Sequence, residues 1–329
     1  MSERLAELRC WLRDELGFDA FTIVPASSDA SFRRYFRVTS GKTSQIVMDA
    51  PPDKEDCGPF ISIASTLSDL GLNVPLILEA DVKRGFLLMS DLGSVHYLQA
   101  LNEQNAERLY GDALQALQLL QTAPMEDAGI PEYDRDLLLR EMVLFRDWYL
   151  ARHLQLTIGE ALSEVLEQTF AFLAEEALGQ PRAWVHRDYH SRNLMVTETS
   201  NPGILDFQDA VIGPVTYDLV SLLRDCYVRW PQERVLQWVR DYLAGSRANG
   251  LLVGIDPQQF QRWFDLMGVQ RHLKAVGIFA RLNYRDGKPG YLPDIPRTLS
   301  YVAEVSRRYS ELSPLRRLLE ELAPIQAPR

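Results

Sequence analysis

Three polar residues in the middle of the chain have types and a spacing that suit phosphoryl transfer. Asp188 is followed by Asn193 five residues later, and Asp206 lies thirteen residues beyond Asn193. Phosphoryl transfer from ATP requires a carboxylate that accepts the hydroxyl proton, and oxygen ligands that hold Mg²⁺ on the phosphates. This hard octahedral ion prefers carboxylate and amide oxygens, which Asp206 and Asn193 provide. The spacing therefore predicts a kinase-type site that uses ATP and Mg²⁺.

Neighbouring residues strengthen this prediction. His186, Asp188 and Asn193 match the H-x-D-x-x-x-x-N catalytic loop of kinases, and Asp206 with the phenylalanine after it matches their metal-binding motif. The alternative is an ordinary loop in which Asp188 caps a turn and Asn193 bonds to the backbone, since both residue types favour turns. Four fixed residue types at this spacing seldom coincide by chance, so we favour the catalytic interpretation.

The elements that position these residues are predicted from hydrophobic periodicity. A leucine repeat that ends before Gly17 predicts a helix, and a second helix is expected at residues 59–70. Strand-like runs lie at residues 21–24, 32–38, 45–48, 76–80 and 85–89. The chain after Ser94 has a helical pattern, except for an island at residues 183–206 whose short apolar runs end at polar loops.

This order of elements predicts an α+β fold with two lobes. A chain of 329 residues exceeds the size at which one hydrophobic core usually keeps growing. We expect a strand-rich N-terminal lobe at residues 1–89, a hinge at residues 90–93, and a helical C-terminal lobe at residues 94–329 that carries the catalytic loop.

Composition and charge exclude several classes of partner. Apolar residues make up 46% of the chain and charged residues 24%, as in ordinary globular proteins. The net charge of −10 argues against nucleic acid and against an anionic membrane surface, because both require a cationic footprint. The three cysteines are far apart, and the N-terminus is unlike a signal peptide, so a cytoplasmic protein with reduced thiols is expected. No obligate protein partner is evident.

The catalytic loop resembles that of the aminoglycoside phosphotransferase and choline kinase superfamily. Residues 28–37, 48–52 and 206–210, followed by Gly213-Pro and Tyr217-Asp218, are similar to one branch of it. That branch comprises the bacterial cell-wall sugar kinases, which phosphorylate the anomeric hydroxyl of N-acetylmuramate and N-acetylglucosamine during recycling. The resemblance covers nearly the whole chain, and it implies a protein-kinase-like fold, a nucleotide-binding N-terminal lobe and a small sugar as substrate.

The resemblance also implies roles for individual residues. Asp188 would be the catalytic base, Asn193 and Asp206 would hold magnesium, and His186 would brace the catalytic loop. Asp218 would support the loop from beneath, although its position suits a simple helix cap equally well.

The hinge has an implied role as well. The resemblance implies that backbone atoms of Ser90 and Leu92 pair with adenine; a plain linker is the alternative.

The sequence departs from the kinase pattern in two places. No GxGxxG is present to cover the phosphates, and the corresponding turn at residues 27–31 offers serines, of which Ser28 and Ser31 are candidate phosphate ligands. Asp49 ends the third strand, where a kinase has its phosphate-binding lysine, and the following helix lacks an obvious glutamate partner.

Arginines could supply the missing cation. Arg33, Arg34 or Arg37 on the neighbouring strand would serve, because arginine binds phosphate in bidentate fashion. The alternative for each is a solvated position on an exposed strand face. Arg192, next to Asn193 in the catalytic loop, is a second candidate for stabilising the transferred charge.

The acceptor site is expected against the late helices. Gln270, Lys274, Gly277 and Arg281 form one polar stripe at helical spacing. Residues 269–297 contain six Lys or Arg and two acids, so a carboxylate-bearing acceptor such as N-acetylmuramate suits this wall better than a polycationic aminoglycoside. The alternative is a solvated helix face.

Other residues flank the reaction centre in sequence. His190 and Asp209 could bond sugar hydroxyls.

Two rival functions stay open at this point. One keeps the chemistry but changes the acceptor to an aminoglycoside, a choline-like molecule or an amino alcohol, which the basic segment disfavours. The other is a pseudokinase that binds nucleotide or a partner without turnover. The missing lysine favours it, whereas the intact Asp188, Asn193 and Asp206 argue against it.

Overall fold

The computed structural model describes residues 3–26, 32–126 and 129–326 of the chain. The chain divides into two compact units. The first comprises Met1–His96 and Leu194–Asp209, and the second comprises Tyr97–Asn193 and Ala210–Arg329.

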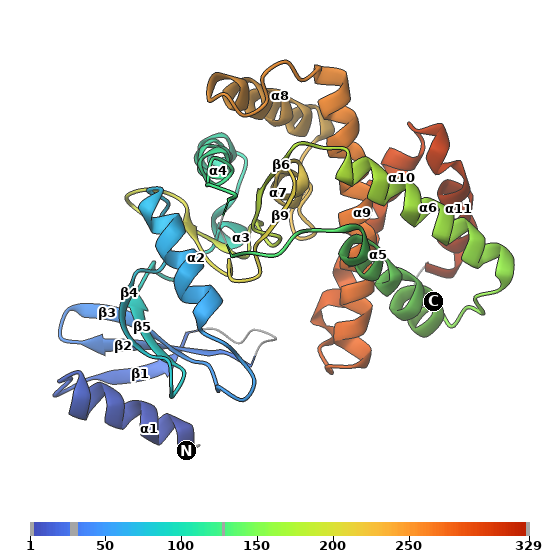
Figure 1. Ribbon diagram of the computed structural model, residues 1–329. Helices are drawn as coiled ribbons and strands as arrows, with labels where there is room; N and C mark the ends of the chain where they lie inside the picture. Colours follow the sequence, from blue (N-terminus) through green and yellow to red (C-terminus); the bar gives the residue numbers. More distant parts are fainter. Residues whose placement is uncertain (1–2, 27–31, 127–128, 327–329) are drawn as a thin grey trace. The chain divides into compact units, whose positions relative to one another are not determined.

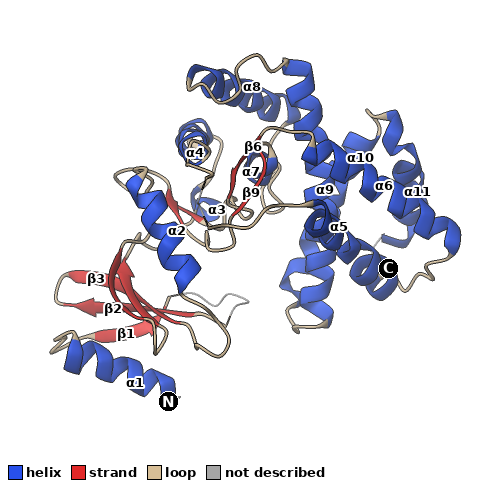
Figure 2. Cartoon of the chain, viewed as in Figure 1, coloured by secondary structure: helices blue, strands red, loops and turns tan. Residues whose placement is uncertain are grey.

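The first unit is built on a five-stranded antiparallel sheet with the strand order β1-β2-β3-β5-β4 (Figures 1 and 2). Its strands are β1 Thr22–Pro25, β2 Arg34–Ser40, β3 Thr43–Asp49, β4 Ile77–Asp81 and β5 Phe86–Ser90. All five runs that the sequence pattern predicts as strands are strands, and each bound shifts by no more than two residues.

Helices lie on both sides of this sheet (Figure 1). They are α1 Glu3–Cys10, which continues as the π-helical turn η1 Trp11–Glu15, and α2 Gly58–Asp69. The core beneath α1 and η1 joins Leu8, Trp11 and Leu12 to Val38, Val47, Phe86 and Leu88. The sheet needs a glycine at position 85, because a Cβ there would lie 1.8 Å from the carbonyl oxygen of Ala50.

The segment Leu194–Asp209 packs with the first unit, whereas the predicted lobes assign it to the helical part. Its two short strands, β7 Leu194–Met195 and β8 Gly203–Ile204, pair with each other. Backbone bridges then join Gly203 to Asn73 and Met195 to His96. The sequence pattern shows short apolar runs here but not their partners, which lie far away along the chain.

The second unit is mainly helical (Figure 2). Its helices are α3 Tyr97–Ala100, α4 Ala106–Leu120, α5 Arg135–Leu144, η2 Phe145–His153, α6 Glu160–Leu178, α7 Tyr217–Leu223, α8 Gln232–Ala248, α9 Pro257–Tyr284, η3 Pro289–Asp294, α10 Ile295–Ser306, η4 Ser310–Leu312 and α11 Ser313–Gln326. A two-stranded sheet pairs β6 Arg182–Val185 with β9 Val211–Pro214, a strand that the sequence pattern did not predict. None of the described helices is long and apolar enough to span a bilayer.

The long helix α9 is the centre of this unit. It begins behind Asp256, whose carboxylate accepts the N–H groups of Gln258 and Gln259 at 2.9 and 3.0 Å and so caps the helix. It packs against α5, η2, α6, α7 and α10. Because neighbours surround its middle part, five polar residues are buried there together with apolar ones, namely Asp265, Gln270, Arg271, His272 and Lys274.

Candidate active site

The first half of the catalytic loop, which follows β6, is held by a buried carboxylate. Asp218 in the first turn of α7 is fully buried, and it accepts the backbone N–H groups of His186 at 2.6 Å and Arg187 at 3.0 Å. Burial raises the pKa of Asp218 to about 6. The carboxylate bonds to the loop rather than capping its own helix, so it supports the loop from beneath.

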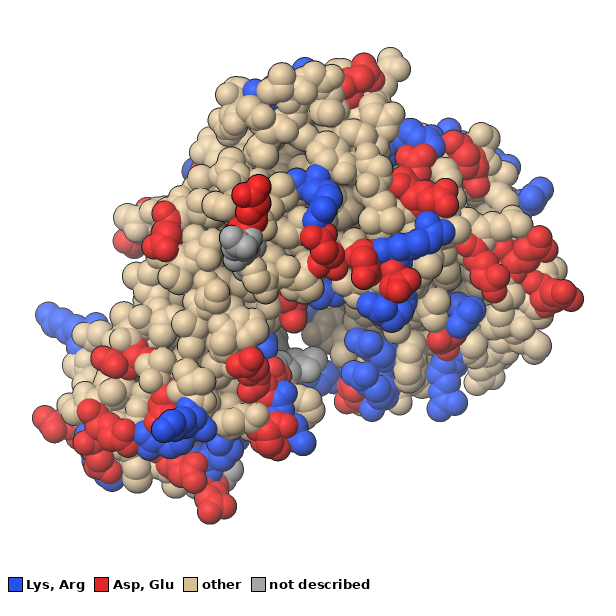
Figure 3. Space-filling model, viewed as in Figure 1, with Lys and Arg blue, Asp and Glu red and all other residues tan. Residues whose placement is uncertain are grey.

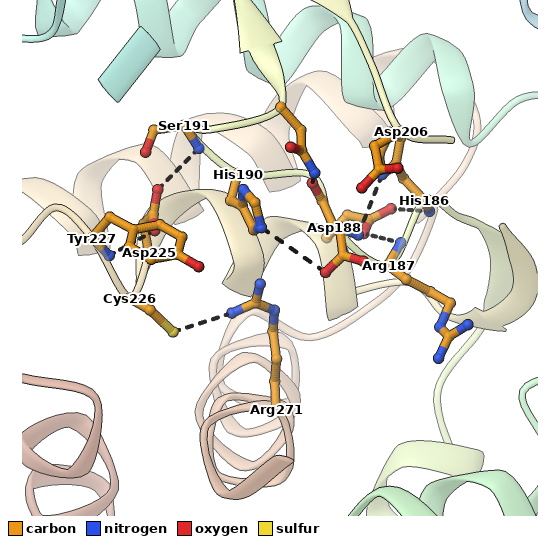
Figure 4. Close-up of polar contacts among 12 residues, drawn as sticks. His186, Arg187, Asp188, His190, Ser191, Asp206, Asp225, Cys226, Tyr227 and Arg271 are labelled. Carbon is orange, nitrogen blue, oxygen red and sulfur yellow. Dashed lines mark hydrogen bonds and ion pairs between the residues drawn. The ribbon is translucent and has the colours of Figure 1, made fainter. Parts of the chain in front are cut away.

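The second half of the loop is held in the same way. Asp225, which follows α7 and is 1% exposed, accepts the N–H group of Ser191 at 2.9 Å (Figure 4). Its other oxygen accepts the N–H group of Tyr227 at 2.9 Å. Two buried carboxylates near one short helix therefore fix the backbone on both sides of Asp188.

Asp188 itself is fixed, accessible and ionised. Arg187 before it has a φ of 76°, a left-handed conformation that costs energy in a non-glycine residue and is typical of functional sites. The backbone N–H of Asp188 donates to Nδ1 of His186 at 3.3 Å, the contact that a bracing residue would make. The Asp188 side chain is 46% exposed.

Charged neighbours decide the protonation state of Asp188. Burial alone would raise the pKa of its carboxyl group, but the positive charges of Lys274 and Arg271 lower that pKa below its usual range. The group is therefore a carboxylate at neutral pH, as a proton acceptor must be.

Asn193 is oriented by the same loop. Its side-chain nitrogen Nδ2 donates to the carbonyl oxygen of Asp188 at 3.0 Å, and its backbone N–H donates to the carbonyl oxygen of His190 at 2.9 Å. An amide whose nitrogen is engaged in this way presents its oxygen on the other side, which fits a ligand for Mg²⁺.

Asp206 belongs to the first unit. It has a φ of 64°, and its Oδ1 accepts the side-chain amide of Gln208 at 2.8 Å. The described residues contain no group of three or more His, Cys, Asp or Glu arranged to hold a metal ion. The amide of Asn193 and the carboxylate of Asp206 each offer the kind of oxygen that Mg²⁺ prefers, and this ion takes further ligands from phosphates and water.

His190 and Asp209 lie in different units. His190 Nε2 lies 3.9 Å from Oδ1 of Asp188, too far for a direct hydrogen bond. Burial lowers the pKa of His190, so its ring is neutral near pH 7. Asp209, in the first unit, accepts the side-chain amide of Gln208 at 3.4 Å.

Arg192 lies between two aromatic rings. Its guanidinium carbon is 4.6 Å from the centre of the Tyr227 ring and 5.0 Å from that of Tyr291, which lies in η3. Cation–π contacts of this kind fix the position of an arginine without neutralising its charge. The catalytic loop is thereby tied to η3, and the cation stays beside Asn193.

Lys274 is not part of an open basic wall. It is 8% exposed, and its Nζ lies 2.9 Å from Oε1 of Glu141 and 2.9 Å from the hydroxyl oxygen of Tyr217. Glu141 also accepts Nη2 of Arg187 at 2.5 Å and the hydroxyl group of Tyr133. This buried network compensates the charge of Lys274 and connects α9 to the catalytic loop.

The rest of the predicted polar stripe is mainly a packing seam. Gln270 donates to the Tyr133 hydroxyl at 3.4 Å, and a Cβ at Gly277 would lie 2.3 Å from the carbonyl carbon of Leu144. The glycine lets α9 approach the end of α5 and the start of η2 closely, so this stripe is covered by these two helices. Arg281 is half-buried, and burial together with the charge of Arg285 lowers its pKa.

Basic residues do gather near that end of the helix. In Figure 3, Lys and Arg side chains cluster over the C-terminal part of α9.

The arginines of the first unit are engaged in ion pairs. Arg34 lies opposite Asp49 in the β2–β3 register, and the fully buried Asp49 carboxylate is bound by both Arg34 and Arg4. Arg33 forms an ion pair with Glu55 at 2.8 Å. Glu55 precedes α2, so the glutamate that pairs with Arg33 lies before the helix and not within it.

The hinge is pinned by an ion pair. Asp91 accepts Nε of Arg37 at 2.6 Å and the N–H group of Gly93 at 2.9 Å. The backbone N–H of Ser90 donates to the carbonyl oxygen of Leu76 at 2.9 Å, so this donor serves the sheet. Pairing of the Ser90 carbonyl group and of Leu92 with adenine stays a prediction, and Ser28 and Ser31 lie outside the described residues.

Sequence reasoning missed three residues of this site, namely Glu141, Asp225 and Arg271. Only Arg271 carries a signal in the sequence, since it lies within a long and largely apolar stretch of α9 where a charge must be buried. Glu141 and Asp225 resemble ordinary surface acids until their partners are known.

Comparison with known proteins identifies the family. The sequence profile of the phosphotransferase enzyme family matches residues 22–253. The chain belongs to this family. It is a phosphotransferase, which removes the binding-only alternative.

Two relatives share one name. The N-acetylmuramate/N-acetylglucosamine kinase of Pseudomonas putida is 48% identical over 322 residues, which cover 95% of this chain and 94% of the relative. The protein of the same name from Neisseria meningitidis is 46% identical over 318 residues, with 95% and 94% coverage.

The phosphotransferase also has the expected fold. The crystal structure of the ADP-bound aminoglycoside phosphotransferase APH(2'')-Ib matches 91% of this chain and 98% of that chain with a TM-score of 0.60. At 16% identity the likeness concerns the fold alone. It shows the two-lobed, protein-kinase-like α+β fold that the sequence predicts.

Proposed function

We propose that this phosphotransferase transfers the γ-phosphate of ATP to the anomeric hydroxyl of N-acetylmuramate or N-acetylglucosamine, in the recycling of cell-wall sugars. The observation that carries the proposal is the name shared by two relatives that are 46% and 48% identical over 95% of the chain. Because ATP is supplied in the cytoplasm, we place the reaction there.

Asp188 is the proton acceptor in this proposal. Its carboxylate is ionised at neutral pH and nearly half-exposed, so a sugar hydroxyl can reach it. As the oxygen of that hydroxyl attacks the γ-phosphorus, its proton passes to Asp188 and the bond to ADP breaks. The two buried supports of the loop keep the carboxylate in place during the transfer.

Asn193 and Asp206 would hold Mg²⁺. The orientation of the Asn193 amide supports this role. When bound, the ion neutralises phosphate charge and aligns the nucleotide. We assign the remaining phosphate charge to Arg192 and Arg33. Arg192 lies beside Asn193, and Arg33 forms an ion pair with Glu55, as the phosphate-binding lysine of a kinase does with its glutamate.

The acceptor assignment agrees with local charge. Within residues 269–297, Arg271 and Arg281 each have a buried Nε without a hydrogen-bond acceptor among the described residues, so their charges would repel an aminoglycoside or choline and favour a neutral or acidic sugar.

The test is ATP turnover with a panel of acceptors: N-acetylmuramate, N-acetylglucosamine, glucose, kanamycin and choline. We expect activity with the two acetylated amino sugars and none with kanamycin or choline. Turnover of kanamycin or choline, with none of either amino sugar, would refute the proposal while leaving the kinase chemistry intact.

A further inference from the structure

Arg271 is a buried cation that has no carboxylate partner among the described residues. It lies on α9 and is 5% exposed. Its Nη1 donates to the thiol of Cys226 at 3.8 Å, which is a weak acceptor, and its Nε is sealed from solvent with no acceptor among the described residues. Burying a guanidinium group without a hydrogen-bonded anion is costly, so such a group is expected to serve a ligand.

Other buried cations of the same unit have carboxylate partners. Arg224 pairs with Asp265 at 2.5 Å, and Lys274 pairs with Glu141 at 2.9 Å. Both of these pairs lie in the same helical environment as Arg271. The lack of a carboxylate partner among the described residues is therefore particular to Arg271 and is not shared by these other buried cations.

That position is next to the reaction centre. Figure 4 shows the Arg271 side chain rising from α9 toward Asp188 and His190. Its positive charge acts on both groups, since it contributes to the lowered pKa values of Asp188 and His190. An acceptor whose hydroxyl lies on Asp188 would thus bring its neighbouring substituents close to the guanidinium group.

We propose that Arg271 binds the carboxylate of an acidic acceptor sugar, the lactyl carboxylate in N-acetylmuramate, and so favours that sugar over neutral N-acetylglucosamine. The inference rests on the proposed function, and it assigns the carboxylate to Arg271 in place of Lys274, whose charge Glu141 compensates. A guanidinium fork matches a carboxylate in geometry, and a neutral sugar leaves the buried charge unpaired.

The test is a cycle that changes the residue and the substrate in turn. Wild type and Arg271→Met are compared by kcat/KM on N-acetylmuramate, its methyl ester and N-acetylglucosamine. In the wild type, esterification should lower kcat/KM about ten- to a hundredfold, as expected for loss of a charged hydrogen bond. In Arg271→Met this penalty should vanish, and kcat/KM should fall about ten- to a hundredfold further on N-acetylmuramate than on N-acetylglucosamine.

Controls separate this role from others. Arg285→Met removes a charge from the same basic segment, but Arg285 is exposed and paired with Asp286, so all three substrates should be unaffected. Thermal melting reports whether each variant folds. If Arg271→Met does not fold, Arg271→Lys enters the same cycle, and the esterification penalty should shrink because the bidentate geometry is lost.

The outcomes are distinguishable. Equal losses on both free sugars, or an esterification penalty that survives in Arg271→Met, contradict the assignment of Arg271. Failure of the wild type to phosphorylate either sugar instead refutes the proposed function.

Discussion

Asp188 meets the requirements of a proton acceptor through neighbours that lie far from it in the sequence. Lys274 on α9 is the strongest of the cations that lower its pKa, and Asp218 on α7 fixes the backbone of the residues before it. The motif around Asp188 predicts the role, whereas the protonation state depends on these distant contacts.

Replacing Asp188 with asparagine tests the role of the carboxylate. Asp188→Asn keeps size and polarity but cannot accept a proton, so kcat should fall about a hundredfold or more with little change in ATP affinity. Steady-state kinetics and nucleotide titration measure the two quantities. Near-normal turnover would show that another group accepts the proton.

Arg33 is the arginine we expect to take the place of the missing strand lysine. Arg34 is committed to the buried Asp49 and Arg37 to the hinge residue Asp91, whereas Arg33 forms a cation–glutamate pair with Glu55. Arg33→Ala should raise KM for ATP or lower kcat about tenfold, because a charged phosphate contact is lost.

The matched control for this change is Arg13→Ala. Arg13 is exposed in the same unit and pairs only with its neighbour Asp14 among the described carboxylates, so its loss should be mild. If Arg33→Ala is as mild as Arg13→Ala, the phosphate charge must be met by Arg192 or by backbone amides.

At the scale of elements, one short helix and the turn after it organise the catalytic loop. α7 contributes Asp218, and Asp225 follows two residues after the helix ends, so both carboxylates reach loop amides from one side. Burying Asp218 is costly, as its raised pKa indicates. The hydrogen bonds offset this cost, because buried N–H groups of the loop need acceptors.

This cost predicts a pH dependence of stability. The pKa of Asp218 is about 6 in the folded protein, against 3.8 for an aspartate in water, so the folded state binds more protons between these values. The contribution of Asp218 to the free energy of unfolding should therefore be fully present below about pH 4 and fall by about 3 kcal/mol as the pH rises past 6.

Urea unfolding of wild type and Asp218→Asn across this pH range measures the contribution. The difference between the two free energies of unfolding should change by that amount in favour of the variant as the pH rises. A difference that does not vary with pH would mean that Asp218 has an ordinary pKa.

At the scale of the whole molecule, the sequence predicts the elements better than their neighbours. The strands of the first unit follow from local patterns, and the motif residues of the catalytic loop follow from spacing. The stripe of Gln270, Lys274 and Gly277 was predicted as an acceptor wall, but it packs against α5 and η2. Helical periodicity shows that residues share a face, and it does not show whether solvent or another helix covers that face.

Buried charges are hard to predict from the sequence for the same reason. Glu141 balances Lys274 and Arg187 across three separate segments, and no local pattern encodes such a network. Arg271 was counted only as one of several basic residues, although its place in a buried stretch of α9 gives it a different role.

The central claim is that the phosphoryl group is transferred to the anomeric hydroxyl of an N-acetylated amino sugar. The most direct measurement is the position of phosphate in the product of N-acetylglucosamine and ATP, determined by ³¹P and ¹H NMR, with the 1-O-methyl glycoside as a blocked substrate. The account predicts phosphate on C1 and no reaction of the methyl glycoside. Phosphate on another carbon, or turnover of the methyl glycoside, would contradict it.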